Sequence, residues 1–268
     1  MAPTFYSGKG PRTLFNNADM SDILQDVTVE ASVNALDVTT HQDNDHVKIA
    51  GLKDGTVDFD GLYDGTAGST ASTASTGALD DRFASALGAS TQPIITVFPT
   101  GDALGRRARM FKAEQTGYTN TAMADDVVKV SASASISGRQ DFGVSLHALA
   151  ARSSTSSTLG NVDTVDAGTT GGGVGHLHYT AGSLAGMTIK IQHSSANTTG
   201  STDSWADLIS FTAVTESSAV ATAVQRTTVS GTVKRRTRAI ISAFSTASGN
   251  TTSGTFAVAF ARRSPILL

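Results

Sequence analysis

Hydrophobic and polar residues alternate most regularly on two runs, at residues 46–53 and 56–65, that flank an Asp-Gly pair. The apolar positions are Val47, Ile49, Val57, Phe59 and Tyr63, and the polar positions between them include Lys48, Asp58, Asp60 and Asp64. Asp-Gly between alternating runs is a strong β-hairpin signal, because a tight primed turn needs positive φ at both central residues. The pattern predicts a hairpin that turns at Asp54-Gly55, with one face buried and one facing water. An isolated hairpin is only marginally stable, so its arms need further strands, from this chain or from a neighbouring copy.

The remainder of the first 150 residues predicts further strands and one helix. The strands are expected over 26–40, 93–99, 106–116, 127–136 and 142–149, with a turn at 137–141 that makes the last two a second hairpin. The helix is expected over 78–87, because Leu79, Phe83 and Leu87 recur every four residues and Gly88 follows them.

The last third of the chain predicts a small β-sandwich. Residues 151–175 are rich in Ser, Thr and Gly with few large apolar side chains, which is typical of a flexible linker. Short strands then follow at 189–191, 205–211, 224–229, 237–244 and 256–260. We therefore expect a mainly β protein, with a domain at 1–150, a linker at 151–175 and an immunoglobulin-like sandwich at 176–268.

Composition and charge narrow the class of protein. The net charge of −3 is unevenly placed, since residues 1–150 carry −7 and residues 176–268 carry +5. The absence of cysteine excludes disulfides, thiolate zinc sites and cysteine nucleophiles. We expect no membrane span, because no run of 18 apolar residues occurs, and no signal peptide, because the first residues lack an apolar core.

Candidate metal and catalytic residues find little support in the sequence. The acidic residues Asp43, Asp45, Asp58, Asp60 and Asp64 lack the spacing of a calcium loop, and we interpret them as a solvated strand face. His176 and His178 would share one side of a strand, but no third ligand lies at a telling distance, so a surface pair is favoured. No nucleophile elbow is present, so we expect no enzyme, no metal and no cofactor, with a hydrolase kept only as a remote alternative.

The one basic cluster, residues 234–238, has two interpretations. It could form a nucleic-acid or glycan patch, or it could pair with the acidic half of a neighbouring copy, which we favour. Trp205 is expected in the core of the sandwich rather than as a platform for sugars.

Several segments together resemble the major tail protein, or tail tube protein, of long-tailed bacteriophages. In the order in which that family has them, they are Asp19-Met20-Ser21, Asp37-Val38-Thr39-Thr40, residues 46–64, Phe98-Pro99-x-Gly101-Asp102-Ala103-Leu104-Gly105, and SGRQDFGVSLH at 137–147. Residues 176–268 resemble the additional β-sandwich that some of these proteins carry outside the tube.

The resemblance implies a tail-tube β-sandwich or barrel with one flanking helix, whose hairpins join those of adjacent subunits. Six copies would close a ring, and stacked rings would form the tube through which DNA leaves. The implied partners are other copies of this chain, the tape measure protein and tail-end proteins, with viral DNA in transit but not specifically bound. The implied location is the virion tail, after assembly in the host cytoplasm, with no membrane contact.

A conduit for DNA must not hold it, because contacts of Lys and Arg with phosphates drive non-specific binding. The residues expected to face the bore are Lys48, Asp58, Asp60, Asp64, Lys129, Ser131, Ser133 and Ser135. The two lysines depart from this rule unless they pair with carboxylates across strands. Contacts between subunits are expected at Asp54, Gly55, Lys234, Arg236 and Arg238, and contacts between rings at the N-terminal arm and the 66–77 loop.

The alternative function is a surface-binding module or capsid decoration protein. In that case the C-terminal sandwich and its basic strand would attach to a glycan, a host surface or a capsid.

Overall fold

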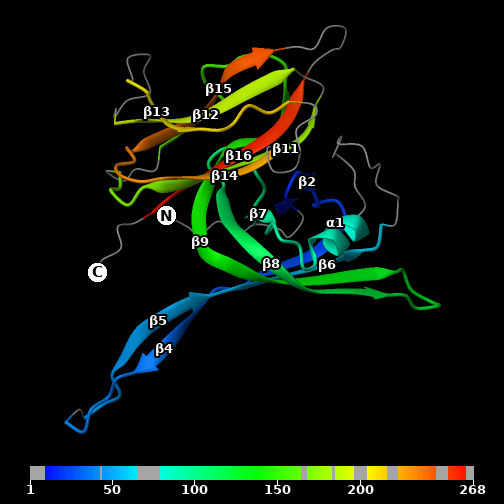
Figure 1. Ribbon diagram of the computed structural model, residues 1–268, viewed down its shortest axis with the longest axis vertical. Coiled ribbons are helices and arrows are strands. Elements are labelled where there is room, and N and C mark those ends of the chain that lie inside the picture. Colours follow the sequence, from blue (N-terminus) through cyan, green and yellow to red (C-terminus); the bar gives the residue numbers. More distant parts are fainter. Residues whose placement is uncertain are drawn as a thin grey trace.

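The computed structural model describes residues 10–42, 44–64, 79–163, 168–182, 185–195, 204–215, 223–245 and 253–263. This part of the chain is mainly β with one short helix, which confirms the predicted fold class (Figure 1). The elements are β1 (Arg12–Phe15), β2 (Ala18–Asp19), β3 (Leu24–Val29), β4 (Ser32–Asp37), β5 (Lys48–Asp54), β6 (Thr56–Leu62), α1 (Leu79–Ala86), β7 (Ile94–Phe98), β8 (Arg107–Thr121), β9 (Lys129–Arg152), β10 (Asn161–Asp163), β11 (Gly173–Gly182), β12 (Gly186–Ser194), β13 (Ala206–Ser210), β14 (Val224–Val229), β15 (Arg236–Ser245) and β16 (Gly254–Arg262). None of the helical structure within those ranges is long and apolar enough to cross a membrane.

A ten-stranded antiparallel sheet is organised around β9. β9 pairs with β8 along one edge. Along its other edge it pairs first with β6, through residues 129–135, and then with β16, through residues 144–152. One strand therefore connects the acidic first half of the chain with the basic last third.

A four-stranded sheet in the order β10-β15-β12-β13 covers the second half of β9 and its neighbours (Figure 1). The core between these sheets is closed by the buried side chains of Leu146, Leu177, Ile189, Ile241 and Phe256. The predicted C-terminal sandwich is thus built partly on a sheet that the first half of the chain supplies. The division into domains at 1–150 and 176–268 stays a prediction.

The helix α1 closes a second core beside the first half of β9. Phe83 is 1% exposed, and its ring centroid lies 5.4 Å from those of both Phe15 and Phe59. The four-residue spacing of apolar side chains therefore predicted the helix and the burial of Phe83, whereas Leu87 lies just after α1 and is 46% exposed.

The hairpin turn predicted at Asp54-Gly55 is wrong. β5 pairs with β4, whereas β6 pairs with β3 and β9, so β5 and β6 do not pair with each other. Together β3–β4 and β5–β6 form the two sides of one long hairpin, closed by the backbone bond from Val38 N to Val47 O at 2.9 Å. Gly55 is buried, and a Cβ there would lie 2.8 Å from the Glu30 carbonyl oxygen. Glycine is needed at this position for the close approach of two backbones and not for a turn.

The second predicted hairpin is also wrong, because its two arms form the single strand β9. The register against β8 shifts between the pairs Met110–Asp141 and Lys112–Ser137. Gly138 lies inside this shift with φ +76°. A glycine with positive φ can form a β-bulge, which bends a strand without reversing it. The local sequence signals a turn in both cases, and the strand pairing decides against it.

The segment predicted as a linker contains strand residues at 151–152, 161–163 and 173–175. β10 and the first residues of β11 lie within 151–175. A Cβ at Gly173 would lie 2.5 Å from the Phe260 ring, and one at Gly175 would lie 2.8 Å from Ile191. Gly173 therefore permits the close approach of a ring from the neighbouring strand β16, and Gly175 permits the close approach of the other sheet, although the low hydrophobicity of the segment indicated flexibility.

Candidate assembly surfaces

The water-facing side of β6 and β9 carries a row of paired aspartates and serines. Asp58 lies opposite Ser133 and Asp60 lies opposite Ser131, and directly opposed residues share one face of a sheet. Ser133 Oγ donates a hydrogen bond of 2.6 Å to Asp58 Oδ1, and Ser131 Oγ donates to Asp60 Oδ1. Val57 and Phe59 lie on the buried side of β6. The predicted alternation on β6 is confirmed.

Additional carboxylates on the same face were missed by the sequence analysis. Asp26 of β3 lies opposite Asp60, and Glu114 of β8 lies opposite Ser135. Glu30 donates its backbone N–H to the Thr56 carbonyl, which places it on this face as well. We call the exposed side chains of Asp26, Glu30, Asp58, Asp60, Glu114, Ser131, Ser133 and Ser135 the acidic face. The alternation over 26–40 could have indicated Asp26 and Glu30, but only the strand order reveals that they join the same face.

The remaining residues expected at the bore lie at or beyond the edges of the acidic face. Lys129 is paired with Asp126 at 2.8 Å, near the end of the β8–β9 hairpin rather than across strands. Asp64 is half-buried just after β6. Lys48 lies on β5 opposite Asp37, outside the sheet that carries the acidic face. That these side chains line a bore stays a prediction.

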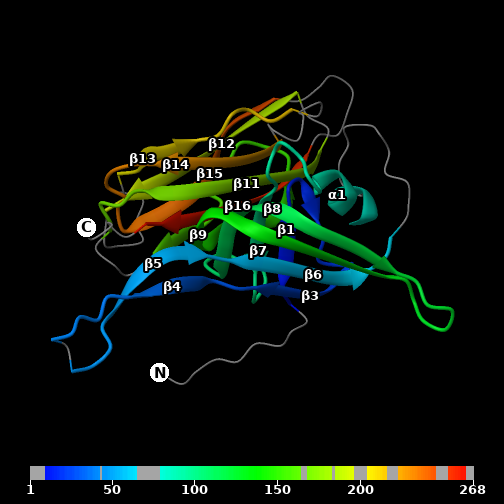
Figure 2. The same cartoon turned by 60° about the horizontal axis from the view of Figure 1, so that its bottom comes forward.

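The β4–β5 pair extends away from the rest of the molecule (Figures 1 and 2). It exposes large apolar side chains. Leu36 lies opposite Ile49, and Val38 and Val47 follow two positions further along the same face. Their exposed fractions are 46%, 51%, 41% and 43%. We call these four side chains the ribbon face. The sequence predicted that Val47 and Ile49 would be buried, and no described residue of this chain buries them.

A second group of exposed apolar side chains lies around the closed end of the β8–β9 hairpin. This end is on the opposite side of the molecule from the β4–β5 pair (Figure 2). Met123 and Val127 in the turn are 60% and 57% exposed, and Tyr63 after β6 is 39% exposed. The Tyr63 backbone N–H bonds to the Val128 carbonyl at 2.9 Å, which joins these residues into one surface. We call Tyr63, Met123 and Val127 the hairpin-end patch. The molecule therefore has one exposed apolar surface on the β4–β5 ribbon and another at the closed end of the β8–β9 hairpin.

The residues expected at contacts between subunits belong neither to the ribbon face nor to the hairpin-end patch. Asp54 accepts the N–H of the buried Gly55 at 2.7 Å. Arg236 is 3% exposed and contacts Asp163 at 3.4 Å. The Arg238 guanidinium donates to Gln192 Oε1 at 2.7 and 2.9 Å. The two arginines therefore already have partners in their own chain. Lys234 is half-buried.

The interpretation of Trp205 as core is wrong. Its ring is half-buried at the surface, and the Arg238 guanidinium carbon lies 4.1 Å from the ring centroid. The N-terminal arm up to residue 9 and the 66–77 loop, both expected between rings, lie outside the described residues.

The interpretation of His176 and His178 as a surface pair is wrong. They are 0% and 1% exposed, and both contact the Thr96 hydroxyl, through His176 Nδ1 at 2.9 Å and His178 Nε2 at 2.7 Å. His178 Nδ1 lies 2.6 Å from the Asn16 carbonyl oxygen. No cluster of three metal-binding side chains occurs among the described residues. The pair is a buried contact between β11 and the β1–β7 region.

No protein-family model and no curated protein matches the chain. Among solved structures, the chain is similar to one from the virion of a native gene transfer agent particle, with 12% identity over 45% of this chain and 84% of that one and a TM-score of 0.36. It is also similar to the tail tube of phage SPP1, with 13% identity over 50% of this chain and 76% of that one and a TM-score of 0.38. The Dit protein of SPP1, described as a hub adsorption apparatus of phages that infect Gram-positive hosts, matches with 12% identity over 94% of this chain and 98% of that one and a TM-score of 0.36.

Proposed function

We propose that this protein is a structural subunit of a phage tail, and that its copies form rings that stack into the tail tube. Six copies per ring is the number that the sequence resemblance implies. The same resemblance gives as further partners the tape measure protein and the proteins at the tail end. In this proposal the protein catalyses no reaction, and the DNA passes through without being specifically bound.

The observation that carries the proposal is the ribbon face. Leu36, Val38, Val47 and Ile49 form a row of apolar side chains on a two-stranded ribbon, which would be marginally stable alone in water. Exposed apolar surfaces of this kind are typical of protein–protein interaction sites. A neighbouring copy would cover this row and would complete the sheet around the ribbon.

The hairpin-end patch offers the matching surface on the neighbour. Because the β4–β5 ribbon and the closed end of the β8–β9 hairpin lie on opposite sides of the molecule (Figure 2), contact between the ribbon face and this patch would be head-to-tail. A head-to-tail contact closes into a ring when the rotation between copies allows it. In such a ring the apolar ends are covered and the sheet edges are paired with neighbours, which removes a route to aggregation.

The acidic face suits the inner wall of that ring. Phosphates are repelled by carboxylates, and Lys129, the lysine at the edge of this face, is paired with Asp126 at 2.8 Å. The hydrogen bonds from Ser131 and Ser133 fix the aspartates at the surface without neutralising them.

Two substitutions on adjacent residues of the ribbon test this proposal. Ile49 belongs to the ribbon face, while Ala50 points to the other side of β5, opposite Ala35. We expect Ile49→Asp to abolish rings and tubes, because a charge on the ribbon face must then be buried at the contact. Ala50→Asp is the matched control and is expected to assemble. Negative-stain electron microscopy gives the readout, and the melting temperature of each purified variant shows whether it is folded.

Three outcomes would count against the tube. Assembly of Ile49→Asp as readily as the unchanged protein would exclude the ribbon face as the contact. Isolated chains at every concentration would exclude a self-assembling subunit. Rings that never stack would indicate a single-ring hub in place of a tube.

A further inference from the structure

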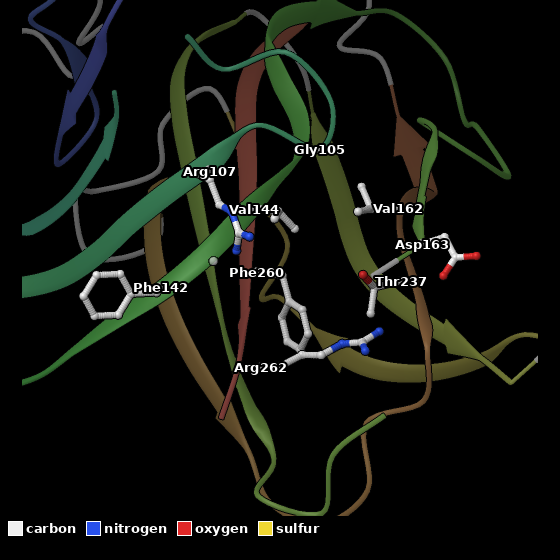
Figure 3. Close-up of a pocket in the computed structure, with 10 residues that line it drawn as sticks. Gly105, Arg107, Phe142, Val144, Val162, Asp163, Thr237, Phe260 and Arg262 are labelled. Carbon is white, nitrogen blue, oxygen red and sulfur yellow. The ribbon is translucent and has the colours of Figure 1, made fainter. Parts of the chain in front are cut away.

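A cleft opens between the two sheets of the C-terminal sandwich, far from the ribbon face. It has a volume of about 340 Å³ and lies where β8, β9 and β16 face β10 and β15 (Figure 3). The side chains that matter for its chemistry are Arg107, Phe142, Asp163, Thr237, Phe260 and Arg262. We propose that this cleft binds an acidic sugar, that is, a single sugar ring bearing a carboxylate.

Two guanidinium groups give the cleft its charge. Arg107 is exposed, and among the described residues it has no hydrogen-bond or ion-pair partner. Figure 3 shows its side chain directed from β8 into the space between the sheets. The Arg262 guanidinium is held in place because its Nη2 donates to the Lys234 carbonyl at 2.5 Å and to the Arg235 carbonyl. Planar guanidinium groups bind carboxylates through paired hydrogen bonds, so an anionic ligand is favoured.

Hydrogen-bonding groups in the wall indicate a ligand that also carries hydroxyls. Thr237 is 0% exposed, and its Oγ1 has no hydrogen-bond partner among the described residues. Buried hydroxyls normally have one, and a ligand hydroxyl would supply it. Asp163 is fixed by Arg235 at 2.7 Å, and a carboxylate can accept several hydrogen bonds, including those from a sugar.

The aromatic rings distinguish a sugar from a simple inorganic anion. Phe260 forms part of the wall. Phe142 is 57% exposed at the edge of the cleft, with its ring directed away from the other side chains in Figure 3 and the Arg109 guanidinium carbon 4.9 Å from its centroid. Apolar C–H groups of a sugar ring can pack against such rings, whereas phosphate has no apolar face and would meet the Asp163 carboxylate. Ligand pockets in proteins have volumes of roughly 300–1,000 Å³. The volume of this cleft lies near the lower end of that range, which is enough for one sugar ring.

Calorimetric titration of the full chain tests the proposal, with glucuronate, glucose and inorganic phosphate as probes. We expect glucuronate to bind and to exceed both other probes in affinity by about tenfold or more, the effect of one hydrogen bond to a charged group. Arg107→Gln should weaken glucuronate by a similar factor, and Thr237→Val should weaken it without loss of the fold. Arg152→Gln, which changes an exposed arginine outside the cleft, is the control and should leave the affinity unchanged.

Other outcomes would overturn the assignment. Phosphate and glucuronate binding equally would show a general anion site, and no binding at millimolar concentrations would show no site. Equal loss in Arg107→Gln and Arg152→Gln would show attraction by net charge alone. Because the cleft lies within one copy, the result does not depend on ring formation, so this proposal can fail while the proposed function holds.

Discussion

Asp141 is a buried carboxylate that forms ion pairs with three arginines. It is 2% exposed, and it contacts Arg226 at 2.6 Å, Arg263 at 2.9 Å and Arg139 at 3.4 Å. These arginines come from the bend in β9, from β14 and from the end of β16, so one carboxylate connects three parts of the fold. Burial lowers the pKa of Arg226, while the hydrogen bond to Asp141 raises the pKa of Arg263.

Asp141→Asn should destabilise the protein by about 3–5 kcal/mol, because it leaves the largely buried Arg226 guanidinium without its counter-charge. Urea unfolding measures this difference. Asp207→Asn is the matched control, since Asp207 pairs with Lys190 at 2.7 Å at an exposed site, and such pairs contribute about 0–1 kcal/mol. Equal effects of the two substitutions would contradict the role of Asp141.

The buried histidines make stability depend on pH. Burial lowers the pKa of His178 to about 4, with the Asn16 carbonyl opposing the shift. Burial also lowers the pKa of His176 well below its usual value, and His178, Arg226 and Lys112 add to this. In the unfolded chain a histidine has a pKa near 6.5, so between about pH 6.5 and pH 4 it is protonated there while the buried histidine of the folded protein stays neutral. The contribution to stability is therefore complete above about pH 6.5 and falls as the pH drops towards 4.

For His178 the loss between these limits is about 3 kcal/mol, from about 1.4 kcal/mol per pKa unit. We expect His178→Gln to be less stable at pH 7.5 but to lose less stability than the unchanged protein on acidification to pH 4.5. Urea unfolding at both values gives the comparison. Parallel losses in the two proteins would show that His178 does not titrate in this range.

At the scale of elements, the long hairpin divides into two parts with different support. β6 has a paired strand on each side, whereas β5 pairs only with β4. Backbone bonds of an unsupported two-stranded ribbon open easily, because few buried contacts oppose the opening.

Hydrogen exchange should therefore separate the two strands. In the isolated chain we expect fast exchange at residues 48–54 and slow exchange at 56–62, and on assembly only 48–54 should gain strong protection. Peptide-level exchange followed by mass spectrometry can compare single chains with tubes. Equal protection of 48–54 in both forms would mean that no neighbour covers the ribbon.

At the scale of the whole molecule, the acidic face lies on the ten-stranded sheet between the β4–β5 ribbon and the closed end of the β8–β9 hairpin, and the other half of the same sheet carries the sandwich (Figure 1). In a ring, this arrangement would direct the carboxylates to one side of the sheet and the sandwich to the outside. The carboxylates of the acidic face would then surround the bore.

Reversing the charge on the acidic face should make the tube retain DNA. We expect tubes of the double substitution Asp58→Lys and Asp60→Lys to bind short DNA at low salt and to release it as salt rises. Co-sedimentation of tubes with labelled DNA measures this. Asp207→Lys places a lysine on the outer sheet, so it should bind less DNA if the acidic face is enclosed. A double variant that binds no more than the unchanged tube would contradict an inner acidic wall.

The sequence by itself determined the β class, the helix and its buried Phe83, and the alternation on β6 and β9, because these follow from the local period of side chains. The acidic positions at 58 and 60 and their serine neighbours were predicted for the same reason. Only the tertiary structure decided that Asp54-Gly55 and Gly138 do not form hairpin turns, since strand pairing is a long-range property that overrides local turn signals. It also decided that His176 and His178 are buried, that Arg236 and Arg238 have partners in their own chain, and that the ribbon face is left uncovered. Each of these features depends on which distant strands pair with one another. The alternation of residues along a single strand does not specify that pairing.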